Sequence, residues 1–400
     1  MIVAMVRPAL VLGVLTLVIF VFTALPQTMK VDYSDRLFKL FMALLFIMMA
    51  SMLFAYHRRV AFEFLFGAYI NAAAFFFVFF VVGNSVQFLK NIMKIACLGT
   101  IIYTMFALLT GQIVQGRLVF GEMFDPNDLS YFIISFLPFS FLFLKKGYPL
   151  YMRILSIINL GIGSIAILMT GSRGGFVGLV VIFVTLLFSK LSAIKLSHKV
   201  IFLILCFVLV AYQAPRIDFQ RLGTVFNPQD DYNLSDEFGR KEIWKAGLIL
   251  MATHPLTGVG LNCFNMAIGE YRQERGVLPK WQTAHNSFIQ IGAETGILGF
   301  ILFILMNVYT YKNFSLVARN SLSTDLVGIG TIARIGFVGN LVCSFFLSQA
   351  YSIYWVLFVV FSIVLRRLND KASVIEEKPQ SSKRVLIRGP AGSLRYGKTS

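Results

Sequence analysis

Long apolar stretches without a single charge alternate with short polar segments along most of this 400-residue chain. Five of these stretches are 17 to 19 residues long: Pro8–Leu25, Leu40–Tyr56, Phe64–Val82, Ile154–Ser172 and Thr295–Tyr311. An α-helix that crosses a bilayer needs about 20 predominantly apolar residues. The pattern therefore predicts an all-α fold, that of a polytopic integral membrane protein.

The whole pattern predicts about 11–12 transmembrane helices. The stretch 326–365 carries one charge, Arg334, and as a single helix it would be about 60 Å long, twice the hydrocarbon thickness. We therefore expect this stretch to turn near Ser348-Gln349. The predicted spans lie near residues 8–25, 38–56, 61–82, 93–110, 129–144, 152–172, 174–189, 200–214, 286–311, 326–346 and 350–365.

The spans divide the chain into five parts. These are transmembrane helices in 1–110, transmembrane helices with an external turn in 111–214, an aqueous loop in 215–285, C-terminal transmembrane helices in 286–366, and a disordered basic tail in 367–400. Within the long loop, Trp244, Leu248 and Met251 recur at i, i+4 and i+7. This spacing predicts a helix over residues 236–253 that lies on the membrane surface and ends at His254-Pro255.

The charges are few and unevenly placed. Only 14% of the residues are charged, against about 25% in soluble domains, and the net charge is +17. Residues 215–280 hold eight acidic and eight basic side chains, whereas residues 366–400 hold nine basic and three acidic ones. Basic residues in short loops mark the cytoplasmic side of a membrane protein. The surplus therefore indicates topology, and we predict no nucleic-acid partner.

This rule places the loops 145–151, 190–199 and 312–324 and the tail inside. The segments 111–128 and 215–285 and the turn at Ser172-Arg173 then lie outside.

The N-terminal third leaves two topologies open. If Arg7 and His57-Arg58-Arg59 are both inside, Lys90 and Lys94 fall outside. Either the N-terminus is external, or Ala61–Lys94 contains a hidden or re-entrant segment.

Two arginines in the external segments are candidate ligands for an anion. Arg173 lies in Thr170-Gly171-Ser172-Arg173-Gly174-Gly175, where a helix begins and glycines allow close approach of a phosphate to the backbone. Arg240 begins the predicted surface helix after Gly239. Each has a structural alternative: Arg173 as an interfacial side chain in a tight turn, and Arg240 as part of a solvated helix face.

His285 is the candidate general base. It lies in Ala284-His285-Asn286-Ser287, where the long loop re-enters the membrane, and an imidazole titrates near neutral pH. Its structural alternative is a helix cap or an interfacial side chain. Asp125 and Asp128 flank Pro126 and Asn127, which favours a turn with a helix cap, and we predict no metal site there.

Two charges inside predicted spans complete the candidates. Glu294 and Arg334 are costly in lipid and are expected to face the protein interior. We expect them to form a structural pair, with an anionic ligand for Arg334 as the alternative. Asn286, Glu294 and Arg334 are further candidates for supporting the site.

Residues from about 110 to 310 resemble the O-antigen ligase / O-antigen polymerase superfamily, whose members are bacterial membrane glycosyltransferases of surface polysaccharides. The chain looks most like the ligases, because His285-Asn286 is followed by nine residues and then by Gly296-x-x-Gly299. The other shared motifs, in order, are Phe124-Asp-Pro-Asn-Asp-Leu129, Thr170-Gly-Ser-Arg-Gly-Gly175, Gly239-Arg-Lys-Glu-Ile-Trp244 and His254-Pro-Leu-Thr-Gly-Val-Gly-Leu-Asn-Cys-Phe264.

The resemblance implies transfer of a glycan from undecaprenyl pyrophosphate to a hydroxyl of the lipid A-core oligosaccharide, without a metal or another cofactor. It implies that Arg173 and Arg240 bind the pyrophosphate and that His285 is the base. A single displacement would invert the anomeric carbon. The resemblance also implies a multi-pass protein of the bacterial inner membrane, with its active site and the loop 215–285 facing the periplasm.

Two other functions stay open at this point. A polymerase of the same superfamily would use the same donor but a different glycan acceptor. A polysaccharide transporter would use Arg334 and Glu294 in its pathway, although the chain has no internal repeat of the kind common in transporters.

Overall fold

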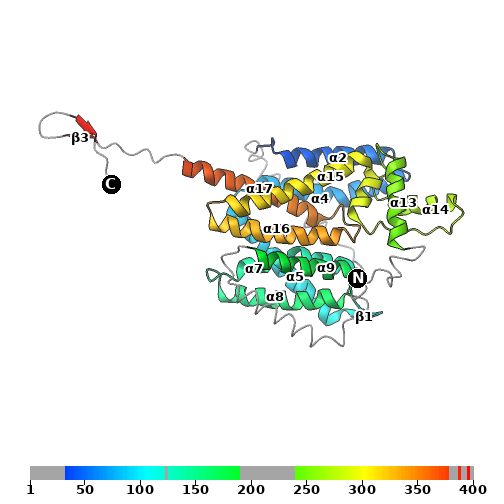
Figure 1. The fold of residues 1–400 in the computed structure, drawn as a ribbon, viewed down its shortest axis with the longest axis horizontal. Coiled ribbons are helices and arrows are strands. Elements are labelled where there is room, and N and C mark those ends of the chain that lie inside the picture. Colours follow the sequence, from blue (N-terminus) through cyan, green and yellow to red (C-terminus); the bar gives the residue numbers. More distant parts are fainter. Residues whose placement is uncertain (1–31, 122–124, 190–238, 378–385, 389–393, 397–400) are drawn as a thin grey trace, which may run out of the picture.

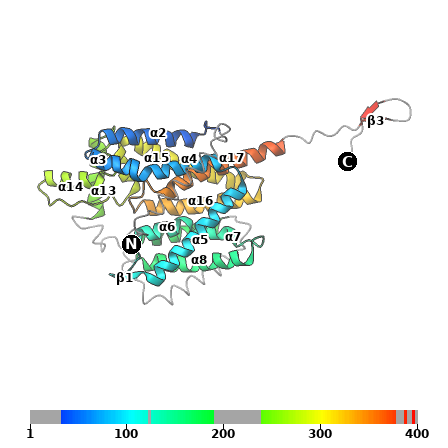
Figure 2. The same cartoon turned by 180° about the vertical axis from the view of Figure 1, so that it is seen from behind.

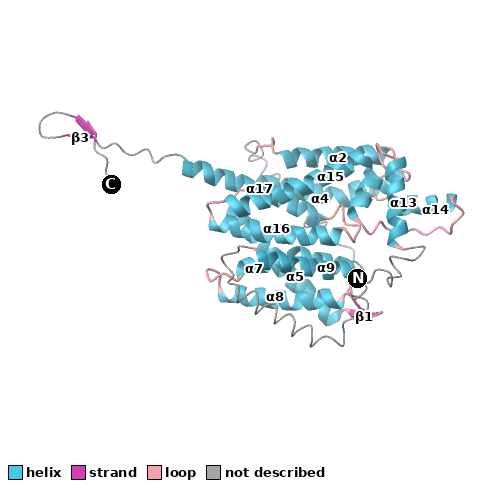
Figure 3. Cartoon of the chain, in the orientation of Figure 1, coloured by secondary structure: helices cyan, strands magenta, loops and turns pink. Residues whose placement is uncertain are grey.

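The computed structural model describes residues 32–121, 125–189, 239–377, 386–388 and 394–396. Most of them form long helices that run side by side in one bundle, and α13 and α14 lie at one end of it (Figure 1). Figure 3 shows that helices dominate and that the strands are short. The all-α fold class is confirmed.

The first half of the described chain supplies the following elements. They are α2 (Arg36–Leu53), α3 (Arg58–Phe62), the π-helix η2 (Glu63–Tyr69), α4 (Ile70–Val82), α5 (Val86–Thr110), β1 (Gln112–Val114), β2 (Arg117–Val119), α6 (Pro126–Phe136), the 3-10 helix η3 (Leu137–Phe139), α7 (Ser140–Phe143), α8 (Leu150–Met169) and α9 (Arg173–Phe188). The strands β1 and β2 form an antiparallel hairpin, which the hydropathy pattern did not predict.

The second half continues after the gap. It consists of α13 (Arg240–Thr253), α14 (Phe264–Glu274), α15 (Ser287–Asn320), α16 (Thr324–Ser344), α17 (Ile353–Glu377), β3 (Leu386–Arg388) and β4 (Leu394–Tyr396). Helix α15 packs against α2, α13, α16 and α17 and so joins the two halves of the bundle. Figure 2 shows α5 crossing the other face of the bundle at a slant.

Six helical runs of the described residues are long and apolar enough to cross a membrane. These are Arg36–Leu53, Arg58–Val82, Val86–Thr110, Leu150–Met169, Ser287–Asn320 and Thr324–Ser344, and α9 is a shorter apolar helix. The chain is therefore a polytopic membrane protein. The predicted spans 8–25 and 200–214 lie outside the described residues, so the total of 11–12 stays a prediction.

Two predicted spans are central helices enclosed by others. Nearly every residue of the run from α6 to α7 is buried, and so is the part of α17 between Trp355 and Leu365. Aromatic rings fill this centre, where Phe358 lies 5.6 Å from Phe337 and 6.1 Å from Phe139, between ring centroids. Hydropathy alone does not distinguish such a helix from one that faces lipid, because both are apolar all round.

The described residues test one of the two N-terminal alternatives, a re-entrant segment in Ala61–Lys94, whereas the orientation of the N-terminus stays a prediction. Residues 61–94 form two complete helical arms with a turn at 83–85, and no re-entrant segment occurs within them. Lys90 pairs with Asp325 at 2.6 Å, whereas His57 pairs with Glu270 of α14 at 3.1 Å. Lys90 therefore lies at the end of the bundle that holds the 321–323 turn, and His57 lies at the other end.

We call the end that holds α13, α14 and the β1–β2 hairpin the site end, and the other the opposite end. Helix α13 runs across the site end and not along the bundle (Figure 1), as the prediction of a surface helix requires. Its buried face is Ile243, Ala246, Gly247 and Leu250. Within the predicted apolar stripe, Leu248 is 50% exposed and Trp244 and Met251 are half-buried, and contact of this stripe with the membrane stays a prediction.

Helix α15 is broken at Gly296, where the backbone adopts φ 74°. The break frees backbone groups, and the segment after α13 binds them: Val259 N–H donates to the Ala293 carbonyl at 2.8 Å, and Gly260 N–H donates to the Glu294 carbonyl at 3.1 Å. On the far side of the break, Ile297 N–H donates to the Pro255 carbonyl at 2.8 Å. Residues 255–260 thus tie the long loop to the bundle.

The C-terminal boundary differs from the expectation. Residues 367–377, predicted as the start of a disordered tail, continue α17, and β3 and β4 form a short antiparallel hairpin apart from the bundle. Arg367 is half-buried and Asp370 and Lys371 are exposed, so this last part of α17 has no continuous apolar pattern that predicts a helix.

Candidate functional site

Arg173 and Arg240 line one small cavity at the site end, although they are 67 residues apart in the chain. Each is the first residue of a helix, α9 and α13 respectively. The N-terminus of a helix carries free N–H groups and a partial positive charge of the peptide dipoles. Two guanidinium groups and two helix N-termini therefore create one positive region around a cavity of about 10 Å³, which has room for about one water molecule.

The turn between α8 and α9 holds Arg173. Gly171 adopts φ 58°, and the hydroxyl of Ser172 caps α9 by accepting a hydrogen bond from Gly175 N–H at 3.2 Å. Gly171 and Gly174 line the cavity, but a Cβ at Gly174 would also lie 3.0 Å from Phe346, and one at Gly175 would lie 2.6 Å from Ser130. The glycine pair therefore serves helix packing, and only Gly171 supplies an unusual backbone conformation.

Trp244 connects α13 to the segment that precedes α15. Its indole N–H donates to the carbonyl of Ala284 at 3.0 Å, and its ring lies 5.6 Å from that of Phe345, between centroids. This contact fixes Ala284, the neighbour of His285, relative to Arg240.

His285 is held in an unusual backbone conformation. Its φ of 47° lies in the left-handed region, and its N–H donates to Oγ of Ser348 at 2.8 Å. The hydroxyl of Thr283 lies 3.4 Å from its Nε2. A non-glycine residue at positive φ stores strain that the surrounding contacts must sustain, which is common at functional sites.

Partial burial and, to a smaller extent, the positive charge of Arg240 lower the pKa of His285 to about 4, and the carboxylate of Asp125 opposes this shift. The imidazole is therefore neutral at pH 7 and keeps a lone pair that accepts a proton. His285 does not line the cavity of the two arginines, but it lies within reach of the charge of Arg240. The structure thus brings together the three residues that the sequence suggested.

Asn286 is the N-cap of α15. Its side-chain oxygen accepts hydrogen bonds from the N–H groups of Phe288 and Ile289 at 2.9 and 3.1 Å. Asn286, and not His285, therefore has the helix-capping role that the sequence suggested as an alternative for His285.

The turn between α16 and α17 docks onto this helix start. Ser287 Oγ donates to the Leu347 carbonyl at 2.7 Å and accepts from Gln349 N–H at 2.9 Å. The predicted turn near Ser348-Gln349 is therefore confirmed, and it lies against His285.

Three residues of the site were missed by the sequence interpretation. Asn127 lines the cavity. Arg117 of β2 donates to the side-chain oxygen of Asn127 at 3.1 Å and to the Thr170 carbonyl at 2.9 Å. Ser348 accepts the hydrogen bond from His285 N–H. Asn127 lies in a motif that the resemblance had marked, so a signal existed for it. Arg117 and Ser348 had none, because their roles depend on contacts between distant segments.

Glu294 and Arg334 do not form the predicted pair. The carboxylate of Glu294 accepts from the Tyr351 hydroxyl at 2.7 Å and from Phe264 N–H at 3.3 Å, and Arg334 donates to the hydroxyl of Ser315 at 3.4 Å. Ser315 lies 21 residues after Glu294 on α15, about 30 Å along the helix. Glu294 therefore fastens the start of α14 and the turn before α17 to the broken helix, and Arg334 lies far from the site.

The Asp125 motif is a helix cap, as predicted. Asp125 accepts from Asn127 N–H at 2.9 Å at the start of α6, and Asp128 accepts from the side chain of Gln349 at 2.8 Å. No group of three or more His, Cys, Asp or Glu side chains is arranged to hold a metal ion among the described residues.

The fold and this site define a polytopic membrane protein with a cationic pocket at one end. Residues 158–304, which include Arg173, Arg240 and His285, match a family model for O-antigen ligase. The resemblance to the O-antigen ligase superfamily is thereby confirmed over this segment, and the match supports a membrane enzyme of the ligase or polymerase type. No curated protein matches the chain.

Proposed function

We propose that this protein is an O-antigen ligase-like glycosyltransferase. It transfers a glycan from undecaprenyl pyrophosphate to a hydroxyl of the lipid A-core oligosaccharide, with inversion and without a metal. The observation that carries the proposal is the convergence of Arg173 and Arg240 on one cavity, with the neutral imidazole of His285 close to Arg240.

The two arginines bind the pyrophosphate of the donor and stabilise it as it leaves. When the anomeric C–O bond breaks, the electron pair goes to the pyrophosphate oxygen, and the negative charge grows in front of the guanidinium groups. Charge-assisted hydrogen bonds from preorganised donors stabilise such a transition state more than the ground state. The arginines thus take the role that a metal ion has in many other transferases.

His285 removes the proton from the acceptor hydroxyl as that oxygen attacks the anomeric carbon from the opposite side. The low pKa keeps the imidazole unprotonated at pH 7. The hydrogen bond from the backbone N–H of His285 to Ser348 Oγ holds the backbone that carries the ring. A positioned general base typically contributes about 10²–10⁴-fold to a rate. The active site would face the periplasm of a bacterial inner membrane.

The test uses the purified protein with an undecaprenyl-pyrophosphate-linked glycan and lipid A-core, in the presence of EDTA. We expect a shift of the lipid A-core band on a gel, and we expect His285→Ala to abolish it. The matched control is His57→Gln, a histidine at the same end that is 43% exposed and pairs with Glu270.

The same experiment separates the alternatives. Lengthening of the lipid-linked glycan without a lipid A-core shift would identify a polymerase, which the family match also supports. An intact donor with neither product would contradict both and favour a transporter. Normal transfer by a folded His285→Ala variant would refute its role as the base.

A further inference from the structure

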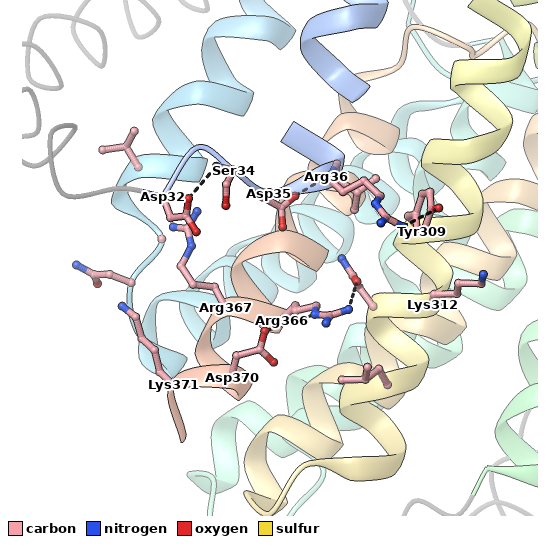
Figure 4. Close-up of a pocket in the computed structure, with 16 residues that line it drawn as sticks. Asp32, Ser34, Asp35, Arg36, Tyr309, Lys312, Arg366, Arg367, Asp370 and Lys371 are labelled. Carbon is pink, nitrogen blue, oxygen red and sulfur yellow. Dashed lines mark hydrogen bonds and ion pairs between the residues drawn. The ribbon is translucent and has the colours of Figure 1, made fainter. Parts of the chain in front are cut away.

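A large cavity lies at the opposite end of the bundle, away from the candidate site. It has a volume of about 1510 Å³ and lies between the start of α2, the end of α4, the second half of α15 and the charged end of α17 (Figure 4). Five cationic side chains line it, Arg36, Lys312, Arg366, Arg367 and Lys371, against three acidic ones, Asp32, Asp35 and Asp370.

The three carboxylates are already engaged by other groups. Asp35 caps α2 by accepting from the N–H groups of Leu37 and Phe38, and Asp32 accepts from Ser34 N–H at 2.8 Å. Asp370 pairs with Arg366 at 3.4 Å. The acidic groups therefore serve the local structure, and the five cations leave a surplus of two positive charges over the three acids.

The cations differ in how firmly their contacts hold them, and the ammonium group of Lys312 has the ring of Tyr309 5.6 Å away, from nitrogen to ring centroid. Arg367 is fixed in the wall, because it donates to the Phe80 carbonyl at 3.0 Å and lies 4.5 Å from the centre of that ring. Arg36 donates to the hydroxyl of Tyr309 at 2.8 Å. Lys312 and Lys371 are exposed, and neither makes an ion pair with another described residue; Figure 4 shows them on opposite sides of the cavity.

The distance between the cavity and the site end, measured along α15, indicates which layer of the membrane surrounds the cavity. Tyr309 lies 22 residues after Ser287, the first residue of α15, which corresponds to about 33 Å along the helix. This is close to the roughly 30 Å thickness of the hydrocarbon layer. With the site end at one membrane face, the cavity therefore lies at the headgroup level of the other, and the apolar side chains of Leu37, Val81 and Leu316 contribute to its walls.

We propose that this cavity binds the phosphate headgroup of an anionic phospholipid. Basic pockets between helices at the headgroup level attract anionic lipids, at about 1 kcal/mol or fivefold in affinity for each cation. The two exposed lysines contact the phosphate from opposite sides of the cavity, while the apolar wall contacts the glycerol end of the acyl chains. This inference goes beyond the proposed glycan transfer and does not depend on it.

The test is a binding titration of the purified full chain in neutral detergent micelles. The probe is phosphatidylglycerol with a fluorescent label on one acyl chain. We expect saturable binding that weakens about 25-fold in the double variant Lys312→Gln/Lys371→Gln. Both lysines are exposed, so thermal unfolding of this variant should match that of the unaltered protein.

The matched control is Lys146→Gln/Arg319→Gln, which removes the same charge from exposed positions at the same end that do not line the cavity. This variant should bind within twofold of the unaltered protein. An equal loss in the control would overturn the proposal, and so would equally tight binding of labelled phosphatidylcholine. Displacement of the probe by millimolar inorganic phosphate would indicate a site for free phosphate and would also overturn it.

Discussion

The two ends of the bundle use positive charge in opposite ways. At the site end, Arg173 and Arg240 begin helices that converge on a small cavity, and the neighbouring loops are tied to helix backbone around the break at Gly296. At the opposite end, the exposed side chains of Lys312 and Lys371 line a cavity of about 1510 Å³. The cations of the site end are thus positioned by helix starts, whereas the two lysines of the opposite end are exposed side chains on flexible stems.

This difference has a physical consequence for what each end can do. Preorganised cations stabilise a charge that develops in a transition state, because no reorganisation is needed when the charge appears. Exposed lysines on flexible stems instead attract a ligand through a field that salt screens. We therefore expect substitutions at the site end to change a rate or the fold, and substitutions at the opposite end to change only lipid affinity.

Removal of both site-end arginines should have the largest effect. Arg173→Gln/Arg240→Gln should lower kcat/KM for transfer by about 10³-fold or more, because loss of a single preorganised donor already costs about 10²–10³-fold. The measurement is the initial rate of lipid A-core modification. The opposite-end variant Lys146→Gln/Arg319→Gln should keep the rate of the unaltered protein, and equal losses in the two variants would erase the contrast between the ends.

Gly296→Ala should destabilise the fold by about 2–4 kcal/mol. The backbone there has φ 74°, and a Cβ would lie 2.5 Å from the carbonyl oxygen of Pro255, so the strap of residues 255–260 would have to move. The free energy of unfolding in mixed micelles measures the effect. Gly147→Ala at the opposite end is the control, because a Cβ there has no atom within 4 Å; equal stabilities would contradict the structural role of the break.

The pH dependence of transfer should reflect the low pKa of His285. With a pKa of about 4, the imidazole stays neutral as the pH falls from 7 to 5.5, so the rate should change less than about twofold and fall only as the pH approaches 4. With the ordinary pKa of about 6.5, the rate would drop about eightfold over the same interval. An eightfold drop that persists in the His57→Gln variant would show that His285 is not buried as described.

The same shift affects stability. The unfolded chain binds a proton at His285 near pH 6.5, and the folded chain does so only near pH 4. The contribution of this group is therefore complete above pH 6.5 and is lost as the pH falls toward 4.

Ser348→Ala should have the smallest of these effects, about a fivefold decrease in the transfer rate. It removes the 2.8 Å hydrogen bond that holds the backbone of His285, and one such bond contributes about 1 kcal/mol. Ser348→Thr keeps the hydroxyl and should restore the rate. A full rate in Ser348→Ala would show that the left-handed conformation of His285 does not depend on this contact.

The sequence predicted the bundle because hydropathy is a local property. The helices α2, α8, α9 and α16 begin and end within a few residues of the predicted spans, and the turn near Ser348-Gln349 followed from bilayer thickness alone. The hairpin β1–β2, helix α14 and the extension of α17 were not predicted. Each is short or polar, and its position is decided by neighbours and not by a periodic pattern.

The candidate site was predicted in part for a similar reason. Arg173, Arg240 and His285 belong to motifs that could be read from the chain, and the structure brings them together. The predicted pair of Glu294 and Arg334 was wrong, because a sequence does not show how far along a bundle each side chain lies. Glu294 lies near the site end and accepts from Tyr351. Arg334 lies toward the opposite end and donates to Ser315.

By itself, then, the sequence determined the class of protein, the main helices and which residue types could bind an anion or accept a proton. Only the tertiary structure decided that two helix N-termini meet at one cavity, that Ser348 holds His285, and that the cations of α15 and α17 gather at the opposite end. The physical reason is range. Hydrophobicity acts through spacing along one helix, whereas hydrogen bonds and charges act only between groups that packing has brought within a few ångströms of each other.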